Sequence, residues 1–316
     1  MNADRGYGDG AEVADVADER KRVVAVDREK IKSYPSNMKL LIFDLDGVIT
    51  TEATYWDIAR EGLREILSPA SDPLPVDFIY WVKNHAINHN WDVAFVALTA
   101  ANRFAEFRAE NESLTGRALM ESCPGYRGAQ WKRVHAVCQT IQDRSPLPDA
   151  GLHTPQETVA LFETLAGLGF ELGVATGRPK AEALAPLDRL GIRRFFPENR
   201  IITHWEVEQA EAVTGIPLGK PHPFVALRVM FPSLALRDLL ELPPQARPGV
   251  FFIGDTASDV GASLASGAIP IGILSALPVG EYRDQRRRTL AGLGCRTILD
   301  SVLDLPSCET LSLATY

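Results

Sequence analysis

The sequence is poor in the features that mark secreted and membrane proteins. It has only four cysteines, which are far apart and form no C-x-x-C pair: Cys123, Cys138, Cys295 and Cys308. A disulfide framework or a cysteine zinc site is therefore not expected. No stretch approaches the ~20 consecutive apolar residues that span a bilayer, and the N-terminus lacks the apolar segment of a signal peptide. We expect reduced thiols, a cytoplasmic location and no membrane partner.

Positive charge is also scarce. The chain has 33 Lys and Arg against 41 Asp and Glu, a net charge of −8 at pH 7. Because phosphate backbones are bound through clustered Lys and Arg, we expect no nucleic-acid partner. The one basic run, Arg286 to Arg288, is more typical of a solvated helix face than of a binding patch. With 316 residues, 46% of them hydrophobic, the chain is long enough for a large core and a second lobe.

What the sequence does contain is an apolar run that ends on two aspartates. Residues 41–52 read LIFDLDGVITTE, with Asp44 and Asp46 followed at once by Gly47. This pattern predicts a buried strand that delivers carboxylates to its C-terminal end, where open α/β sheets place their chemistry. Buried carboxylates must be neutralised by a divalent cation, by a substrate that arrives with one, or by a shared proton.

Three further segments carry polar residues at strand ends and helix starts. FELGVATGRP ends a strand on Thr176, LGKPHP places Lys220 between Gly and Pro, and VFFIGDTASD ends a strand on Asp255 with Asp259 four residues later. Each segment alone is weak evidence, because aspartates favour strand-end turns and helix N-termini, and an isolated lysine is usually a surface residue. The ordered set is specific.

In this order the four segments resemble the motifs of the haloacid dehalogenase superfamily, over roughly Lys39 to Leu305. The resemblance implies an α/β fold: a Rossmann-like core with a doubly wound parallel sheet, and a helical cap inserted between the first two motifs, as in the phosphoglycolate phosphatase-like group. The pattern of strands and helices after residue 151 independently predicts a parallel, doubly wound sheet.

The resemblance also implies the role of each motif residue. Asp44 is the expected nucleophile, which forms an aspartyl-phosphate, and Asp46 the general acid and base. Thr176 is expected to hydrogen-bond a phosphoryl oxygen, and Lys220 to hold charge on the same group while keeping Asp44 ionised. The implied reaction is phosphohydrolysis of a small phosphomonoester.

A Mg²⁺ cofactor is implied as well. Asp255 is the expected direct ligand, together with Asp44 and the backbone carbonyl of Asp46. Asp259 is expected to reach the metal through water or to orient Lys220. Mg²⁺ prefers oxygen ligands and retains waters, which fits a site with few carboxylates.

The substrate is left open, except that it should be a small phosphorylated metabolite. Asp46 favours phosphoesters, because dehalogenases of this superfamily lack the second aspartate, but a sugar phosphomutase or a nucleotide pyrophosphatase remains an alternative. From another class, the chain could be a non-catalytic regulatory module that binds a phosphorylated ligand. Gly177 and Arg178 follow the second motif; Arg178 is either a substrate contact or a surface residue at a helix start.

Composition and helical spacing predict the domain organisation. We expect a flexible N-terminal tail over residues 1–36, with one marginal helix near residues 13–30. The core domain should comprise residues 37–53 and 151–316, and a helical cap domain residues 54–150. Thr154-Pro155-Gln156-Glu157 is a capping box that should start a core helix.

The cap segment NHAINHNWDVAF supports two interpretations. Four of its residues could face the active site and read the substrate: Asn88, Asn90, Trp91 and Asp92. Equally, Asn90 could cap a helix that buries Trp91. His85 and His89 have the i, i+4 spacing of a zinc pair, but no Glu beside the first and no third ligand nearby supports a metal site.

Overall fold

The core of the protein is a six-stranded sheet in the order β3-β2-β1-β4-β5-β6, in which every pair of neighbours is parallel. The computed structural model describes residues 38–67, 72–87, 89–100, 103–144 and 151–312, so the expected N-terminal tail and its helix lie outside the described residues. The strands are β1 (Leu40–Phe43), β2 (Glu171–Ala175), β3 (Ile201–Ile202), β4 (Val250–Gly254), β5 (Ile269–Ile273) and β6 (Thr297–Leu299).

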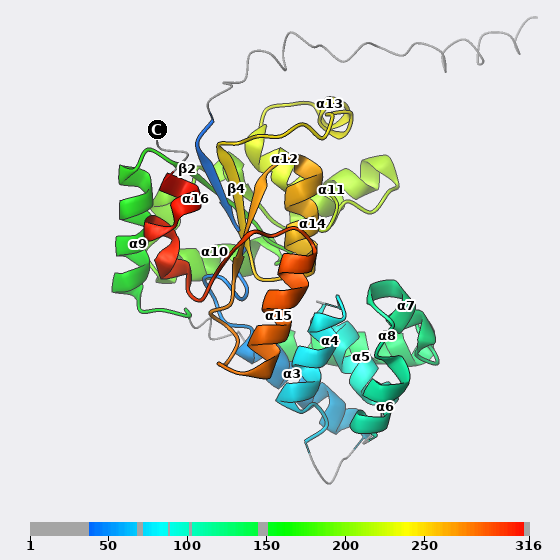
Figure 1. Ribbon diagram of the computed structural model, residues 1–316. Coiled ribbons are helices and arrows are strands. Elements are labelled where there is room, and N and C mark those ends of the chain that lie inside the picture. The colour runs from blue at the N-terminus through cyan, green and yellow to red at the C-terminus, as the bar shows by residue number, and fades with distance from the viewer. Residues whose placement is uncertain (1–37, 68–71, 88, 101–102, 145–150, 313–316) are drawn as a thin grey trace, which may run out of the picture. The chain divides into compact units, whose positions relative to one another are not determined.

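Helices cover both faces of the sheet (Figure 1). Apolar residues of β1 pack with α9 (Pro155–Gly167) and α10 (Lys180–Arg189) on one face, together with α16 (Glu309–Ser312). On the other face α12 (Phe224–Met230) lies against β1 and β2, and α14 (Ala257–Ser266) lies against β4 and β5. A strand buried on both faces must be apolar throughout, which explains the runs LLIF and VFFIG. The expected doubly wound α/β core is confirmed.

The segment between β1 and α9 is helical, as expected, and we call it the cap. Its helices are α3 (Ala53–Leu67), α4 (Val76–Asn84), α5 (Asn90–Ala100), α6 (Phe104–Asn111), α7 (Gly116–Ser122) and α8 (Ala129–Arg144). They enclose a hydrophobic cluster of their own, in which the ring of Phe78 packs on Trp81, Phe104 and Phe107. We propose that this separate cluster defines the cap as a domain distinct from the core. The first cap helix, α3, begins at Ala53, one residue before the expected start of the cap domain at residue 54.

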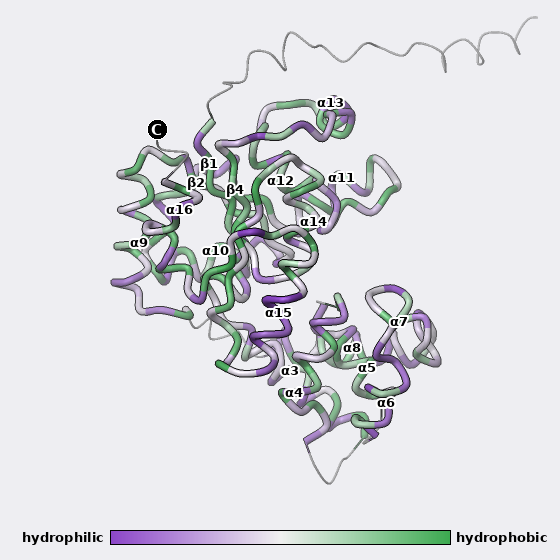
Figure 2. Tube along the Cα trace, viewed as in Figure 1, coloured by the Kyte–Doolittle hydropathy of each residue, from purple (hydrophilic) through white to green (hydrophobic). Residues whose placement is uncertain are grey.

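Two further helices of the core matter for the site. These are α11 (His204–Thr214), which begins at the cavity wall, and α15 (Glu281–Gly292). The remaining described elements are α13 (Leu236–Leu240) and the 3₁₀ turns η1 (Arg193–Phe195), η2 (Glu198–Arg200) and η3 (Val302–Ser307). Figure 2 shows much of α15 in the hydrophilic colour, and α15 packs against α4 of the cap. No helix of the described residues is long and apolar enough to cross a membrane.

Local sequence signals fall close to the observed element ends. Thr154 caps α9 with its side chain and forms the reciprocal contact with Glu157, with Pro155 at the first turn, as the capping box predicted. The structure ends β2 at Ala175, one residue before the expected Thr176. The helix of the segment NHAINHNWDVAF begins at Asn90 itself, so Asn90 is the first residue of α5 and not the residue before it.

Candidate active site

The motif residues come together where three neighbouring strands end. Asp44 follows β1, Thr176 follows β2 and Asp255 follows β4, and β1 lies between the other two in the sheet. After β1 the chain adds β2 and β3 on one side of β1, and it then adds β4, β5 and β6 on the other side. The direction in which strands are added therefore reverses at β1. At such a switch point a crevice opens at the carboxyl ends of the strands. All three residues line one cavity of about 1210 Å³ between core and cap.

Two glycines allow the backbone and carboxylates to approach closely. Gly47 has φ +79°, and a Cβ built on it would lie 2.4 Å from Cγ of Asp255. A Cβ on Gly254 would lie 2.3 Å from Cβ of Asp259. Only glycine fits either position, because the first needs a left-handed backbone and both lack room for a side chain. Gly47 therefore lets Asp255 come close to the turn after β1, and Gly254 lets Asp259 come close to the end of β4.

Lys220 joins two of the aspartates. Its Nζ lies 2.8 Å from Oδ2 of Asp44 and 2.7 Å from Oδ1 of Asp259. Burial alone would lower the pKa of Lys220, but the carboxylates of Asp259 and Asp44 raise it above its usual value, so the lysine is held as an ammonium. The other oxygen of Asp259, Oδ2, accepts hydrogen bonds from the backbone N–H and the hydroxyl of Thr256. Asp259 thus contacts Lys220 directly, and its role as the residue that orients the lysine stays a prediction.

Three carboxylates lie close together at the ends of these strands. Ligand oxygens of Asp44, Asp255 and Asp259 all lie within 4.8 Å of one another. Burial raises the pKa of Asp44 to about 8, and burial also raises that of Asp255 to about 7. In both cases burial penalises the ionised carboxylate more than the nearby basic groups, Lys220 for Asp44 and Lys83 and Arg286 for Asp255, compensate for it. A hard divalent cation would supply the missing compensation, and the all-oxygen donor set fits Mg²⁺.

Behind Asp255 lies a buried basic group that sequence reasoning placed wrongly. Arg286 of α15 is 2% exposed, so it is not part of a solvated helix face. Its Nη1 donates to the backbone carbonyl of Asp255 at 2.6 Å, and its Nε donates to Oδ1 of Asn84 in α4 at 2.7 Å. Lys83, next to Asn84, forms an ion pair with Glu52, which precedes α3. The periodicity of α15 could have flagged Arg286, because Leu290, also buried, lies one turn later on the same face.

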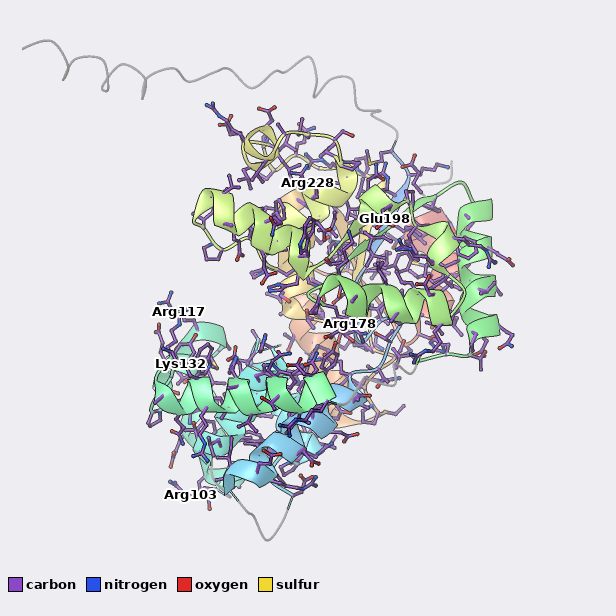
Figure 3. All side chains as sticks on the ribbon, turned by 180° about the vertical axis from the view of Figure 1, so that it is seen from behind. Arg103, Arg117, Lys132, Arg178, Glu198 and Arg228 are labelled. Atoms are coloured by element: carbon purple, nitrogen blue, oxygen red, sulfur yellow. The ribbon has the colours of Figure 1, made fainter. Side chains whose placement is uncertain are left out.

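Arg178 is bound to Asp46. Its Nε lies 2.9 Å from Oδ2 and its Nη2 lies 2.5 Å from Oδ1 of Asp46, and Nη2 also donates to the hydroxyl of Thr50 (Arg178 is labelled in Figure 3). The guanidinium lies over the ring of Tyr55 in α3. Arg178 is 3% exposed and lines the cavity, so it is not a surface residue. These contacts position Asp46; a direct contact with substrate stays a prediction.

The comparison with protein families agrees with the geometry. The model of the haloacid dehalogenase-like hydrolases matches residues 38–267, which is more than half of the chain. The chain belongs to this family.

Comparison with solved structures adds the shared fold. A structural-genomics target solved by X-ray crystallography is 20% identical, with 88% of this chain and 100% of that chain covered and a TM-score of 0.62. A proposed phosphoglycolate phosphatase from Lactobacillus delbrueckii subsp. bulgaricus is 18% identical (86% and 98% covered, TM-score 0.54). A proposed haloacid dehalogenase-like hydrolase from Bacteroides fragilis is 16% identical (85% and 99%, TM-score 0.52). The comparison with curated proteins gives no significant match.

The remaining candidate residues of this family member also lie at the cavity. Thr176 is 1% exposed, its hydroxyl accepts from the backbone N–H of Arg178, and Gly177 lies between them on the cavity wall. From the cap, Asn90 and Trp91 line the same cavity. Trp91 is 7% exposed and belongs to the hydrophobic cluster of the cap, so it has a packing role there. A contact between Trp91 and the substrate stays a prediction. Asn88 lies outside the described residues.

The histidine pair suggested by spacing does not form. His85 is buried, with Nδ1 2.7 Å from the carbonyl of Trp81 and Nε2 3.2 Å from the carbonyl of Glu112. Both ring nitrogens are therefore used within the packing of the cap. His89 instead stacks on His135. Spacing of four residues failed here because a turn separates the end of α4 from the start of α5.

Proposed function

We propose that the protein is a Mg²⁺-dependent phosphohydrolase that cleaves a small phosphomonoester through an aspartyl-phosphate. The observation that supports this most strongly is the arrangement around Asp44. Its carboxylate lines the cavity, lies 2.8 Å from the Lys220 ammonium, and shares one spot with the carboxylates of Asp255 and Asp259. A nucleophile, a charge-compensating lysine and an all-oxygen cation site within a few ångströms are what phosphoryl transfer requires.

In the first step an oxygen of Asp44 attacks phosphorus, and the bond between phosphorus and the leaving oxygen breaks. Asp46 acts as the acid: in its protonated form, which requires one of its two contacts with Arg178 to open, it gives its proton to that leaving oxygen. The product alcohol departs and the phosphoryl group stays on Asp44 as a mixed anhydride. Since Oδ1 of Asp44 accepts a hydrogen bond from the N–H of Leu45 and Oδ2 binds Lys220, the carboxylate is held in one orientation for the attack.

In the second step water attacks phosphorus, Asp46 accepts a proton from that water, and the bond between phosphorus and Asp44 breaks. Inorganic phosphate leaves and both aspartates return to their starting states. Lys220 holds charge on the phosphoryl oxygens in both steps, and the hydroxyl of Thr176 and the backbone N–H at Gly177, which line the same cavity, would donate hydrogen bonds to them.

Asp44 and Asp255, with the backbone carbonyl of Asp46, would hold the Mg²⁺. When bound, the ion offsets the charge that gathers between the phosphoryl group and the carboxylates. Both oxygens of Asp259 are already engaged by Lys220 and Thr256, so we propose that Asp259 acts mainly through the lysine. The cavity is larger than a phosphate needs, so the cap side has room for the leaving group of a metabolite.

Turnover of p-nitrophenyl phosphate with Mg²⁺ and with EDTA tests the reaction class, and release of phosphate from a panel of metabolite phosphates tests the substrate class. We expect phosphate release that requires Mg²⁺ and is lost in chelator. Full activity in EDTA, with no bound metal in elemental analysis, would contradict the metal assignment. Conversion of a sugar phosphate into its isomer without phosphate release would instead identify a mutase.

The covalent step is tested with Asp44→Asn, with Asp188→Asn as the matched control because Asp188 is an exposed aspartate of α10. We expect the first variant to lose turnover and the second to keep it. The melting temperature of Asp44→Asn in chelator should equal or exceed that of wild type, since burial penalises the Asp44 carboxylate when no cation is bound and Lys220 keeps Asp259 as its partner. If Asp44→Asn kept a tenth of wild-type kcat, a barrier change of only ~1.4 kcal/mol, the mechanism would be wrong.

A further inference from the structure

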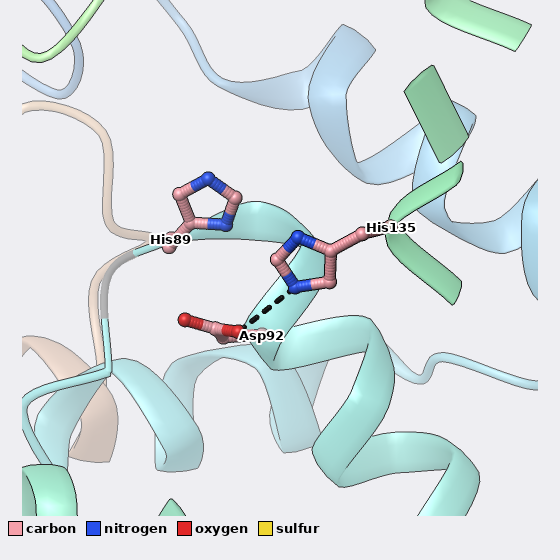
Figure 4. Close-up of side chains that lie close together, drawn as sticks. All are labelled: His89, Asp92 and His135. Carbon is pink, nitrogen blue, oxygen red and sulfur yellow. Dashed lines mark hydrogen bonds and ion pairs between the residues drawn. The ribbon is translucent and has the colours of Figure 1, made fainter. Parts of the chain in front are cut away.

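A second group of metal-ligating side chains lies in the cap, apart from the motif residues. It consists of His89, Asp92 and His135 (Figure 4). One potential ligand atom of each residue lies within 4.8 Å of the others, and Nε2 of His135 is 3.0 Å from Oδ1 of Asp92. The rings of His89 and His135 are nearly parallel, with an interplanar angle of 6° and centroids 5.2 Å apart. All three side chains retain some exposure.

The elements that carry the three residues hold them in place. Asp92 lies in the first turn of α5, His135 lies in α8, and the two helices pack against each other. Trp131, one turn before His135, donates from Nε1 to Oδ1 of Asp92 at 2.8 Å, and its ring lies 4.0 Å from that of His135. A carboxylate oriented by an indole N–H and an imidazole stacked on the same indole resemble the supporting contacts that fix ligands in metal sites.

We propose that His89, Asp92 and His135 form a binding site for a divalent transition-metal ion such as Zn²⁺. Two imidazole nitrogens and one carboxylate oxygen are a donor set that suits zinc, whereas Mg²⁺ prefers oxygen alone. The proposal does not rest on the proposed function, because no motif residue belongs to the cluster. It also differs from the all-oxygen site at Asp44, so the two sites should select different ions.

The distances are compatible with the ion. Two ligands at the usual zinc bond lengths of ~2.0–2.2 Å and a tetrahedral angle lie about 3.3 Å apart. The observed 3.0 Å between Nε2 of His135 and Oδ1 of Asp92 therefore needs to widen by a few tenths of an ångström. The ion would replace the proton that these two atoms share, and the proton would leave to solvent. The ligand atom of His89 lies within 4.8 Å of the other two and would have to move closer to them to complete the set.

The site opens toward the catalytic cavity. His89 and Asp92 line the same cavity as Asp44. Three protein ligands leave a tetrahedral zinc ion with one free position, which water or an anionic group of a bound ligand fills. The metal in the cap would therefore present a positive centre to the part of a substrate that lies away from the motif residues.

Zn²⁺ titration of the full-length protein, with Mg²⁺ in large excess, tests the site by calorimetry and by elemental analysis after dialysis. We expect about one equivalent in wild type, and at least tenfold weaker binding in His89→Gln and His135→Gln. His153→Gln is the matched control, because His153 is a half-buried histidine that contacts Ser301. It should bind like wild type, and so should Asp44→Asn, which alters the other site.

Co²⁺ provides an independent readout. A site with nitrogen ligands and low coordination should give strong visible absorption, which His135→Gln removes and His153→Gln retains. Zn²⁺ should also raise the melting temperature of wild type and of the control but not of the two ligand variants. Zinc binding of equal strength in wild type and both ligand variants, or no binding beyond that of the denatured chain, would overturn the proposal.

Discussion

Arg178 holds both carboxylate oxygens of Asp46, through Nε at 2.9 Å and Nη2 at 2.5 Å. A bidentate pair fixes the plane of the carboxylate as well as its position. The same guanidinium donates to the backbone carbonyl of Glu182 and lies over Tyr55, whose hydroxyl donates to the side chain of Glu182. Because Tyr55 belongs to the cap and Glu182 to α10, the orientation of Asp46 is linked to the contact between cap and core.

Arg178→Lys should lower kcat by at least tenfold, which corresponds to about 1.4 kcal/mol of barrier. A lysine ammonium is a point donor and cannot hold both oxygens of Asp46 in one plane. The fall should be similar for p-nitrophenyl phosphate and for the best metabolite, because Asp46 acts on any leaving oxygen. Arg296→Lys, at an exposed position, is the control. A variant that changes KM for one substrate alone would make Arg178 a specificity residue instead.

Arg286 and Arg288 should behave differently although they belong to one run of three arginines. Arg286→Ala removes a buried guanidinium that donates to the carbonyl of Asp255 and to Asn84, and should cost about 3 kcal/mol or more of the free energy of unfolding. Arg288 is exposed, so Arg288→Ala should change stability by no more than about 0.5 kcal/mol. Urea unfolding of both variants measures this. Equal stability of the two would mean that Arg286 is not buried.

Asn90→Ala and Trp91→Ala should have different effects: the first should change activity and the second stability. Asn90 is half-exposed on the cavity wall, so its loss should lower kcat/KM for the best substrate more than for p-nitrophenyl phosphate, with little change in melting temperature. Trp91 is 7% exposed in the cap cluster, and its loss should cost roughly 3–5 kcal/mol in stability. If Asn90→Ala lowers both activities equally, substrate reading must lie elsewhere in the cap.

The thiols should resist alkylation in the folded protein. Burial raises the pKa of Cys138 to about 12, and burial raises that of Cys123 and of Cys295 to about 11. An unfolded thiol has a pKa of about 8.5. Since the folded values are higher, the stability that these thiols contribute is present below the unfolded pKa and is lost as the pH rises toward the folded values.

Alkylation with iodoacetamide at pH 8.5, followed by mass spectrometry, measures this protection. We expect slow modification of the native protein and rapid modification of the same protein in guanidinium chloride. Native rates that match the denatured ones would show that the cysteines open readily to solvent.

The sequence by itself determined the elements whose causes are local. The capping box at Thr154 formed, and the apolar runs before Asp44 and Asp255 became the strands β1 and β4, because hydrogen bonds within three or four residues and apolar runs are visible in the chain. The four segments placed Asp44, Thr176, Asp255 and their neighbours at strand ends. In a parallel sheet these ends share one edge, so their meeting could be predicted too.

Only the tertiary structure decided which partners those residues take. Arg178 binds Asp46 across 132 positions, Arg286 reaches Asn84 across 202, and His135 meets Asp92 across 43. Neither the run of arginines nor the histidine spacing predicted these pairs. Burial of a charged side chain depends on the charges that other elements bring to it, and that is set by how the helices pack and not by the residues next to it in the chain.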